Sequence, residues 1–195
     1  MKNILIINAH QFYENFSEGK LNSTMVDVAK NEFLQKNYNV KTTIIDGGYD
    51  IEEEVEKHLW ADVIITQSPV YWFNTPWTHK KYIDEVFTCG LVQQNLIIDD
   101  GRSRDDVNKH YGTGGKMQGK KFMLSLTWNA PKKAFDDKRQ FLYEGKSVDD
   151  ALLSVTTNYK FCGSRILPSF SCYDVIKNPN INDDISSYIN HIKDL

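Results

Sequence analysis

Short apolar runs alternate along this chain with stretches in which apolar residues recur every three or four positions. Short runs are typical of strands buried on both faces of a parallel sheet, and the longer period is typical of amphipathic helices. The pattern predicts strands at 3–8, 40–45, 63–65, 121–127 and 165–171. It predicts helices at 20–36, 51–59, 75–87, 134–143, 148–162 and 181–192.

Because strands and helices alternate, we expect an α/β fold with a parallel sheet and helices on both faces. About five strands at this length suit the doubly wound strand order 2-1-3-4-5. We therefore expect one domain over residues 1–195. A polar segment with several glycines at about 88–118 breaks the pattern, and an insertion of this length is usually a functional loop or else disordered.

The apolar run at 63–65 leads into a loop that carries far more aromatic surface than a solvated loop normally holds. The loop contains Pro69, Val70, Tyr71, Trp72 and Phe73. It either packs back on the core or forms the wall of a site for a flat, apolar ligand. Ligands of doubly wound sheets bind past the carboxyl ends of the strands, where the order reverses, and this position favours the wall.

The loop before the first predicted helix has anion-binding potential. Free amides, the helix dipole, hydroxyl groups and a lysine could together hold a phosphate, although an ordinary capped helix start would look similar. The spacing is not Gly-x-Gly-x-x-Gly, so we do not expect a nicotinamide-type Rossmann site. The candidate residues are Ser17, Gly19, Lys20, Leu21, Asn22, Ser23 and Thr24.

A second aromatic turn follows the strand at 121–127 and contains Thr127, Trp128, Asn129 and Ala130. A phosphate-binding first loop and two aromatic loops at one sheet edge indicate a flavin, with its phosphates in the first loop and its ring between the others. Because Trp128 follows a strand end, we expect it to face the ligand more than the core.

Composition and charge limit the classes of partner that this protein is expected to bind. With 41% hydrophobic and 25% charged residues and a net charge of -3, the chain is ordinary for a soluble protein, and neither nucleic acid nor an anionic membrane is indicated as the main partner. The three cysteines are far apart, which fits a reducing cytoplasm and predicts neither a disulfide framework nor a zinc site. We expect no membrane span and no metal, and we interpret Glu52, Glu53, Glu54 and Glu56 as a solvated helix face.

Two longer motifs, Lys-Lys-Tyr-Ile-Asp at 80–84 and Ser-Leu-Thr-Trp-Asn-Ala-Pro at 125–131, resemble the modulator-of-drug-activity-B family. Shorter pieces at 3–8, 59–63, 76–78 and 119–121 extend the resemblance over nearly the whole chain. Members of this family are flavodoxin-like NAD(P)H:quinone oxidoreductases. The resemblance implies a homodimer with FAD in each subunit, protection against oxidative stress, and NAD(P)H as the electron donor.

The resemblance also implies two-electron reduction of quinone to quinol, with nicotinamide and quinone using the same site in turn in a ping-pong scheme. It places FAD contacts on 17–24, 69–73 and 127–130, and on Tyr111 donated by the other subunit. The flavin carries the hydride chemistry. Tyr111 and His79 are candidates for a proton relay, although His79 also fits as a helix residue packed beside Ile83.

Three alternatives share the predicted fold. They are an FMN-binding electron carrier, an NAD(P)H-dependent FMN, nitro or azo reductase, and an interaction protein without cofactor. For the insertion we expect a role in the dimer, because ordering it loses roughly 1–2 kcal/mol of backbone entropy per residue and a second surface would supply missing burial. Its apolar residues are too few to offset that loss alone: Leu91, Val92, Leu96, Ile97 and Ile98.

Overall fold

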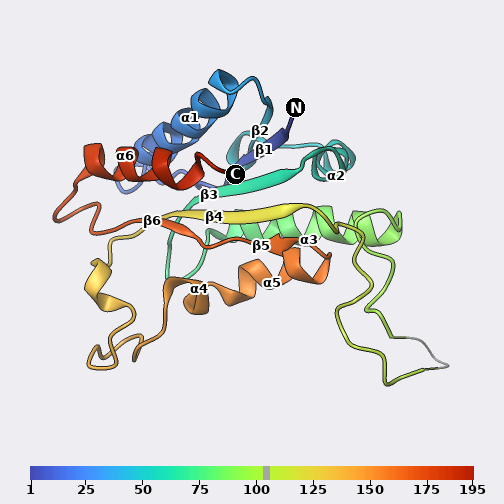
Figure 1. The fold of residues 1–195 in the computed structure, drawn as a ribbon. Coiled ribbons are helices and arrows are strands. Elements are labelled where there is room, and N and C mark those ends of the chain that lie inside the picture. The colour runs from blue at the N-terminus through green and yellow to red at the C-terminus, as the bar shows by residue number, and fades with distance from the viewer. Residues whose placement is uncertain (103–105) are drawn as a thin grey trace.

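The computed structural model describes residues 1–102 and 106–195, and its strands form one sheet with helices on both faces (Figure 1). The strands are β1 (Asn3–Asn8), β2 (Asn39–Ile44), β3 (Val63–Pro69), β4 (Lys121–Thr127), β5 (Arg165–Ile166) and β6 (Phe170–Cys172). The α-helices are α1 (Lys20–Gln35), α2 (Ile51–Trp60), α3 (Trp77–Val92), α4 (Val148–Ala151), α5 (Leu153–Phe161) and α6 (Ile181–Ile192). Single 3-10 turns lie at Ile45–Gly47 and Lys132–Ala134.

The strand order is β2-β1-β3-β4-β5, and β6 also pairs with β4. Each of these pairings is parallel, so the predicted doubly wound order is confirmed. The sheet therefore brings the carboxyl ends of β1, β3 and β4 to one edge, with β3 at the centre.

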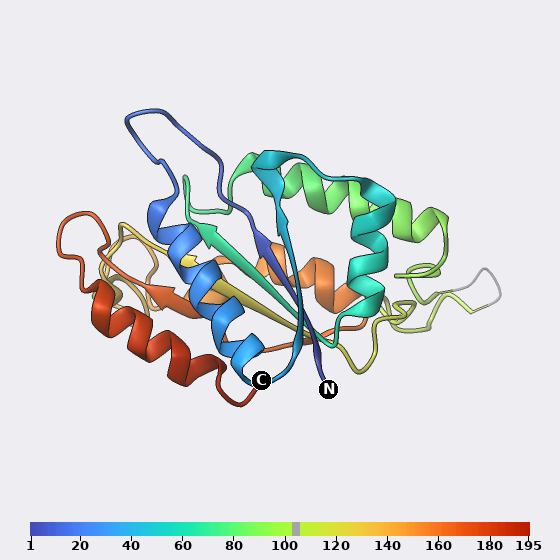
Figure 2. The same cartoon turned by 90° about the horizontal axis from the view of Figure 1, so that it is seen from above.

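Alternate residues of each strand face opposite layers. Ile4 and Ile6 pack with α1 and α6, whereas Leu5 and Ile7 pack with the layer that holds α2, α3 and α5. Figure 2 shows α1 and α6 side by side, and Figure 1 shows α3 and α5 on the other side of the sheet. The five residues 63–67 of β3 are completely or almost completely buried, as a strand between two helical layers requires.

Two predicted elements are divided in the structure. The predicted strand at 165–171 is two short strands, because Pro168 between them has no N–H for the ladder. The predicted helix at 148–162 is α4 followed by α5, with Leu152 between them at φ -105° and ψ 18° and its side chain fully buried.

The predicted helix at 134–143 is wrong. Only the 3-10 turn at Lys132–Ala134 forms there, and Asp136 then takes a left-handed φ of 58°, which an α-helix does not tolerate. The chain folds back on itself instead, since the amide of Asp136 donates to the carbonyl of Lys146 at 3.1 Å. Phe135 is buried by this fold-back and stacks on Tyr143 with ring centroids 4.4 Å apart.

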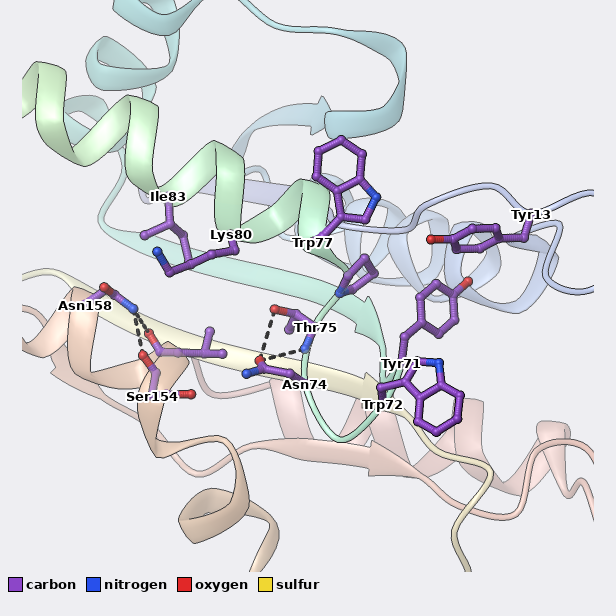
Figure 3. Close-up of a pocket in the computed structure, with 12 residues that line it drawn as sticks. Tyr13, Tyr71, Trp72, Asn74, Thr75, Trp77, Lys80, Ile83, Ser154 and Asn158 are labelled. Atoms are coloured by element: carbon purple, nitrogen blue, oxygen red, sulfur yellow. Dashed lines mark hydrogen bonds between the residues drawn. The ribbon is translucent and has the colours of Figure 1, made fainter.

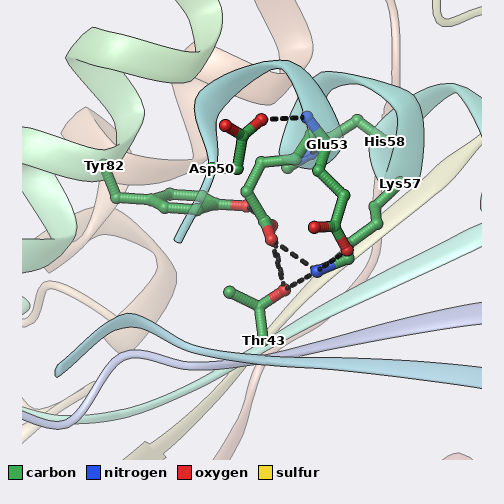
Figure 4. A network of polar contacts seen from close by, with 7 residues as sticks. Thr43, Asp50, Glu53, Lys57, His58 and Tyr82 are labelled. Atoms are coloured by element: carbon green, nitrogen blue, oxygen red, sulfur yellow. Dashed lines mark hydrogen bonds and ion pairs between the residues drawn. The ribbon is translucent and has the colours of Figure 1, made fainter. Parts of the chain in front are cut away.

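The interpretation of the four glutamates of α2 as a solvated face is wrong for Glu54, which is only 1% exposed. Its carboxylate accepts hydrogen bonds from Tyr82 of α3 at 2.6 Å and from Thr43 of β2 at 2.9 Å, and it pairs with Lys57 at 2.7 Å (Figure 4). This network joins α2 and α3 to the sheet edge, and α3 starts where the aromatic loop ends. Glu52, Glu53 and Glu56 are exposed, as predicted.

Candidate functional site

Hydrogen bonds connect the loops that follow β1, β3 and β4. The hydroxyl oxygen of Tyr71 lies 2.6 Å from Oγ of Ser17 and 3.1 Å from the carbonyl oxygen of Gln11. These contacts join the loop after β3 to the loop after β1. The amide of Val70 donates to the carbonyl of Thr127 at 3.0 Å, which ties the same loop to the end of β4. The predicted loop residues therefore meet at one edge of the sheet.

The first loop reaches α1 through Gly19, which has a left-handed φ of 80°. A Cβ atom at Gly19 would lie 2.7 Å from the ring of His10, so only glycine fits beside this buried histidine. No side chain in the described part of the chain caps the start of α1. The first amides of a helix need partners from outside its own turns, and here an anion could be that partner.

The residues predicted to bind an anion at the start of α1 differ in burial and in their hydrogen bonds. Asn22 is buried; its side-chain amide donates to the main-chain carbonyl of Gln67 at 3.3 Å and accepts from the side-chain amide of Gln67 at 3.1 Å. It also donates to the side-chain oxygen of Asn8 at 2.7 Å, so it joins β1 to β3. The hydroxyl of Thr24 donates to the carbonyl of Lys20 within α1. Lys20 is exposed and pairs with Glu18 at 2.9 Å, while Leu21 is half-buried and Ser23 is exposed.

The aromatic loop contains a strained turn. Trp72 and Phe73 have consecutive left-handed φ angles of 48° and 69°, which are costly for large side chains. The main chains of Tyr71 and Asn74 close the turn with hydrogen bonds of 2.8 and 3.1 Å. As a result the indole of Trp72 is 93% exposed beside the half-buried ring of Tyr71 (Figure 3). Pro69, in contrast, is buried at the end of β3.

Trp128 lies inside the fold with 2% of its surface exposed. Its ring packs against Phe135 at a centroid distance of 4.9 Å, and its indole N–H donates to Ser171 at 3.2 Å. The parts of this turn that remain open are the exposed Asn129 and the half-buried Ala130. The expectation that the Trp128 ring faces a ligand therefore finds no support in this arrangement.

Replacing Trp128 by alanine is thus expected to lower the free energy of unfolding by about 3–5 kcal/mol, the usual cost of truncating a buried tryptophan or phenylalanine. Chemical denaturation of the cofactor-free protein measures this loss directly. The exposed Phe141 is a matched control, and Phe141→Ala should change stability by less than about 0.5 kcal/mol. Wild-type stability for Trp128→Ala would show that neighbours fill the gap.

A cleft of about 420 Å³ extends from the aromatic loop between α3 and α5 (Figure 3). The sequence predicted that the aromatic loop lines a site, but nothing in it indicated that α5 lines the other side. Because α5 starts some eighty residues after the start of α3, only the fold brings the two helices together. Its lining residues are Tyr13, Tyr71, Trp72, Asn74, Thr75, Pro76, Trp77, Lys80, Ile83, Ser154, Val155 and Asn158.

His79 of α3 is fully buried, and its ring stacks on the ring of Tyr82 with centroids 6.4 Å apart. Its Nδ1 lies 3.0 Å from the hydroxyl of Thr75, and burial lowers the pKa of His79 to about 3. The imidazole is therefore neutral at physiological pH. The helix begins at Trp77, two residues after Thr75, with Pro76 at the capping position and no side-chain cap from the described residues.

Tyr111 is far from the loops of its own chain. It is 69% exposed, and its ring contacts Phe161 at the end of α5 with a centroid distance of 5.2 Å. That end adjoins β5, which pairs with the beginning of β4, so Tyr111 lies at the opposite edge of the sheet from the carboxyl ends of the strands (Figure 1). Tyr111 cannot contribute to the site of the chain that carries it.

A doubly wound parallel sheet with polar and aromatic loops at its carboxyl edge defines a flavodoxin-like protein. The model of the Flavodoxin-like fold family matches residues 2–195, and this chain belongs to that family. The chain is 44% identical to the NADPH:quinone oxidoreductase MdaB of Haemophilus influenzae over 98% of its own length and 97% of that protein. The resemblance to the modulator-of-drug-activity-B family is thereby confirmed.

Two further proteins are similar to this chain over most of its length. An uncharacterised protein of Schizosaccharomyces pombe is 43% identical, with 98% of this chain and 96% of that protein covered. The crystal structure of a putative quinone reductase from Klebsiella pneumoniae superimposes with a TM-score of 0.79 at 22% identity, covering 98% of this chain and 84% of that chain, which shows a common fold. In the described residues, no helix is long and apolar enough to cross a membrane.

Proposed function

We propose that this protein is an NAD(P)H:quinone oxidoreductase that uses FAD. The observation that carries the proposal is the meeting of three loops at one edge of the sheet, held by the contacts of Tyr71 with Ser17 and of Val70 with Thr127. The 44% identity to an NADPH:quinone oxidoreductase over almost the full length supports this activity over that of an electron carrier.

The residues at this edge fit a flavin nucleotide. The uncapped start of α1, the absence of a side chain at Gly19 and the exposed Ser23 suit a pyrophosphate, which would receive main-chain N–H donors there. The exposed indole of Trp72 and the half-buried ring of Tyr71 offer aromatic surface for the flavin ring. When bound, FAD would supply the hydride chemistry between the nicotinamide and the quinone.

The protein's own contribution is positioning and electrostatics. Tyr71 and Asn74 use their main-chain groups to close the strained turn, so we assign the amides of Trp72 and Phe73 at its centre as donors toward the electronegative edge of the ring. Because this turn is fixed by the bond from Val70 to Thr127, the donors are in place before a ligand binds. His79 positions Thr75, and its low pKa argues against a proton relay there.

We also propose a homodimer in which Tyr111 completes the site of the partner. The support is geometric, since Tyr111 is exposed at the sheet edge opposite the loops of its own chain. The exposed apolar residues Val92, at the end of α3, and Val107, within the insertion, offer surface for association. The free cysteines Cys89, Cys162 and Cys172 support the cytoplasm as the place of action.

Purified protein is expected to be yellow and to release FAD on denaturation, because the uncapped start of α1 would offer main-chain N–H donors to its pyrophosphate. Chromatography of the released pigment measures this. FMN as the released flavin would contradict the FAD assignment and favour the FMN-dependent alternatives, and a colourless protein that takes up neither flavin would contradict both. Initial rates with NADPH and a quinone should give the parallel double-reciprocal lines of a ping-pong scheme.

A further inference from the structure

The cleft between α3 and α5 begins at the candidate flavin loops and extends well beyond them. At one end it is lined by Tyr13, Tyr71 and Trp72, which belong to or contact those loops. At the other end it reaches Ser154 and Asn158 of α5 (Figure 3). A volume of about 420 Å³ lies in the range of roughly 300–1,000 Å³ typical of small-molecule sites.

The floor and walls of the cleft are apolar. Pro76, Ile83 and Val155 line it between the two helices, and all three are buried in the fold. The indole of Trp77, the first residue of α3, stands at its rim and is largely exposed. Binding of an apolar ligand in such a cleft is favourable, because it removes apolar surface of both the ligand and the protein from water.

Two polar side chains of the cleft, Asn158 and Thr75, have partners within the protein. Asn158 donates its amide N–H groups to the carbonyls of Ser154 and Val155 at 2.8 and 3.1 Å. The Thr75 hydroxyl is paired with His79 at 3.0 Å. Groups that are satisfied in this way do not need hydrogen bonds from a ligand, so they tolerate an apolar one.

The cleft also has little free charge, which favours an apolar ligand. Lys80 is the one charged side chain among its described lining residues, and Asp84 holds its ammonium group with contacts of 2.5 and 2.7 Å. A neutralised lysine gives little attraction to a phosphate or carboxylate. An uncharged, apolar ligand segment is therefore favoured over the phosphate-bearing part of a nucleotide.

We propose that this cleft binds the isoprenoid tail of a prenylated quinone, with the quinone ring at the Tyr71 and Trp72 end. The inference rests on the proposed quinone reductase function and narrows its substrate class to quinones that carry such a tail. The ring then lies next to the loops that would hold the flavin, while the tail runs between α3 and α5 toward Ser154 and Asn158.

The test compares two quinones that share one ring and differ only in a prenyl tail, reduced by the wild type and by Ser154→Phe. Ser154 is exposed at the far end of the cleft, so a larger side chain should fill the trough without disturbing the core. The KM for the tailed quinone should rise about tenfold, because several methyl and methylene groups lose their contacts. The KM values for the tail-less quinone and for NADPH should stay the same.

Thr157→Phe is the matched control. Thr157 lies on the same helix and is exposed, but it does not line the cleft, so this variant should reduce both quinones like the wild type. A readout independent of turnover is quenching of tryptophan fluorescence by the oxidised quinones, since Trp72 and Trp77 line the cleft. The tailed quinone should quench at lower concentration than the tail-less one, and Ser154→Phe should abolish that difference.

Three results would overturn the proposal. The first is an equal loss of activity with both quinones in Ser154→Phe. The second is a rise in KM for NADPH alone, which would assign the cleft to a nucleotide. The third is a change in the sedimentation of Ser154→Phe, which would assign the cleft to a second copy of the chain. If the wild type reduces neither quinone, the proposed function fails, and tail-dependent quenching still decides whether the cleft binds a prenyl chain.

Discussion

Replacement of residues 99–113 by an Asn-Gly turn is expected to give a folded monomer that has lost FAD and at least about a hundredfold of its quinone reductase activity. The replaced stretch includes 103–105, which lie outside the described residues. Its ends are adjacent, because the amide of Ile98 donates to the carbonyl of Gly114 at 2.9 Å and Ile97 forms a bridge with Gly115. A two-residue turn therefore closes the gap without strain.

The base of the insertion stays in place in this variant. Leu96 and Ile97 are buried in the core of their own chain, which corrects the expectation that these residues need a second subunit for burial. Leu96 packs so closely on Gly90 of α3 that a Cβ there would lie 2.5 Å from it. The outer part of the insertion, which carries Val107 and Tyr111, remains as the candidate dimer surface.

Sedimentation velocity, flavin content and quinone reduction are the measurements for this variant. Tyr111→Ala serves as the companion variant, because it removes one exposed ring and leaves the rest of the surface. It should remain dimeric and lose about three- to tenfold in activity, as expected when an aromatic contact of roughly 0.5–1.5 kcal/mol is lost. A shortened protein that is still dimeric, yellow and active would contradict the dimer proposal.

The second large effect is expected for Glu54→Ala, which should lower the free energy of unfolding by about 3–5 kcal/mol. The change leaves Lys57 without its buried partner and leaves the hydroxyls of Tyr82 and Thr43 without an acceptor. Burial is the main cause that raises the pKa of Tyr82 well above its ordinary value, so this hydroxyl keeps its proton and needs an acceptor. Figure 4 shows how these groups converge on the one carboxylate.

Urea denaturation of the cofactor-free proteins measures the loss. Glu53→Ala is the control, since Glu53 is exposed on the same helix and contacts Lys57 at 3.1 Å from the solvent side. Surface ion pairs contribute about 0–1 kcal/mol, so the control should remain close to the wild type. Equal stability of both variants would mean that the buried network contributes nothing to the packing of α2 against α3.

The fold was predictable because it depends on local patterns. Apolar runs such as 63–65 mark strands between two helical layers, and the alternation of strands with helices leads to a parallel doubly wound sheet. That topology also brings three strand ends together, so the candidate loops could be named from the sequence. The proposal that Tyr111 belongs to the partner's site rests on the resemblance and not on any local pattern.

The unpredicted features depend on contacts between distant segments. Glu54 looks like its exposed neighbours in sequence, and only the approach of Tyr82 from α3 selects it for burial. Trp128 has the position of a ligand contact, yet the fold-back that buries Phe135 also covers it. The far wall of the cleft comes from α5, whose place beside α3 follows from the packing of both helices on the sheet.

The central claim is that the three loops hold a flavin that passes electrons from NAD(P)H to a quinone. Anaerobic titration of the purified protein with NADPH, followed by a tail-less quinone, measures both half-reactions in one cuvette. The account predicts that one equivalent of NADPH bleaches the flavin absorbance and that one equivalent of quinone restores it, with quinol as the product. A flavin that NADPH does not reduce, or that the quinone does not reoxidise, would contradict it.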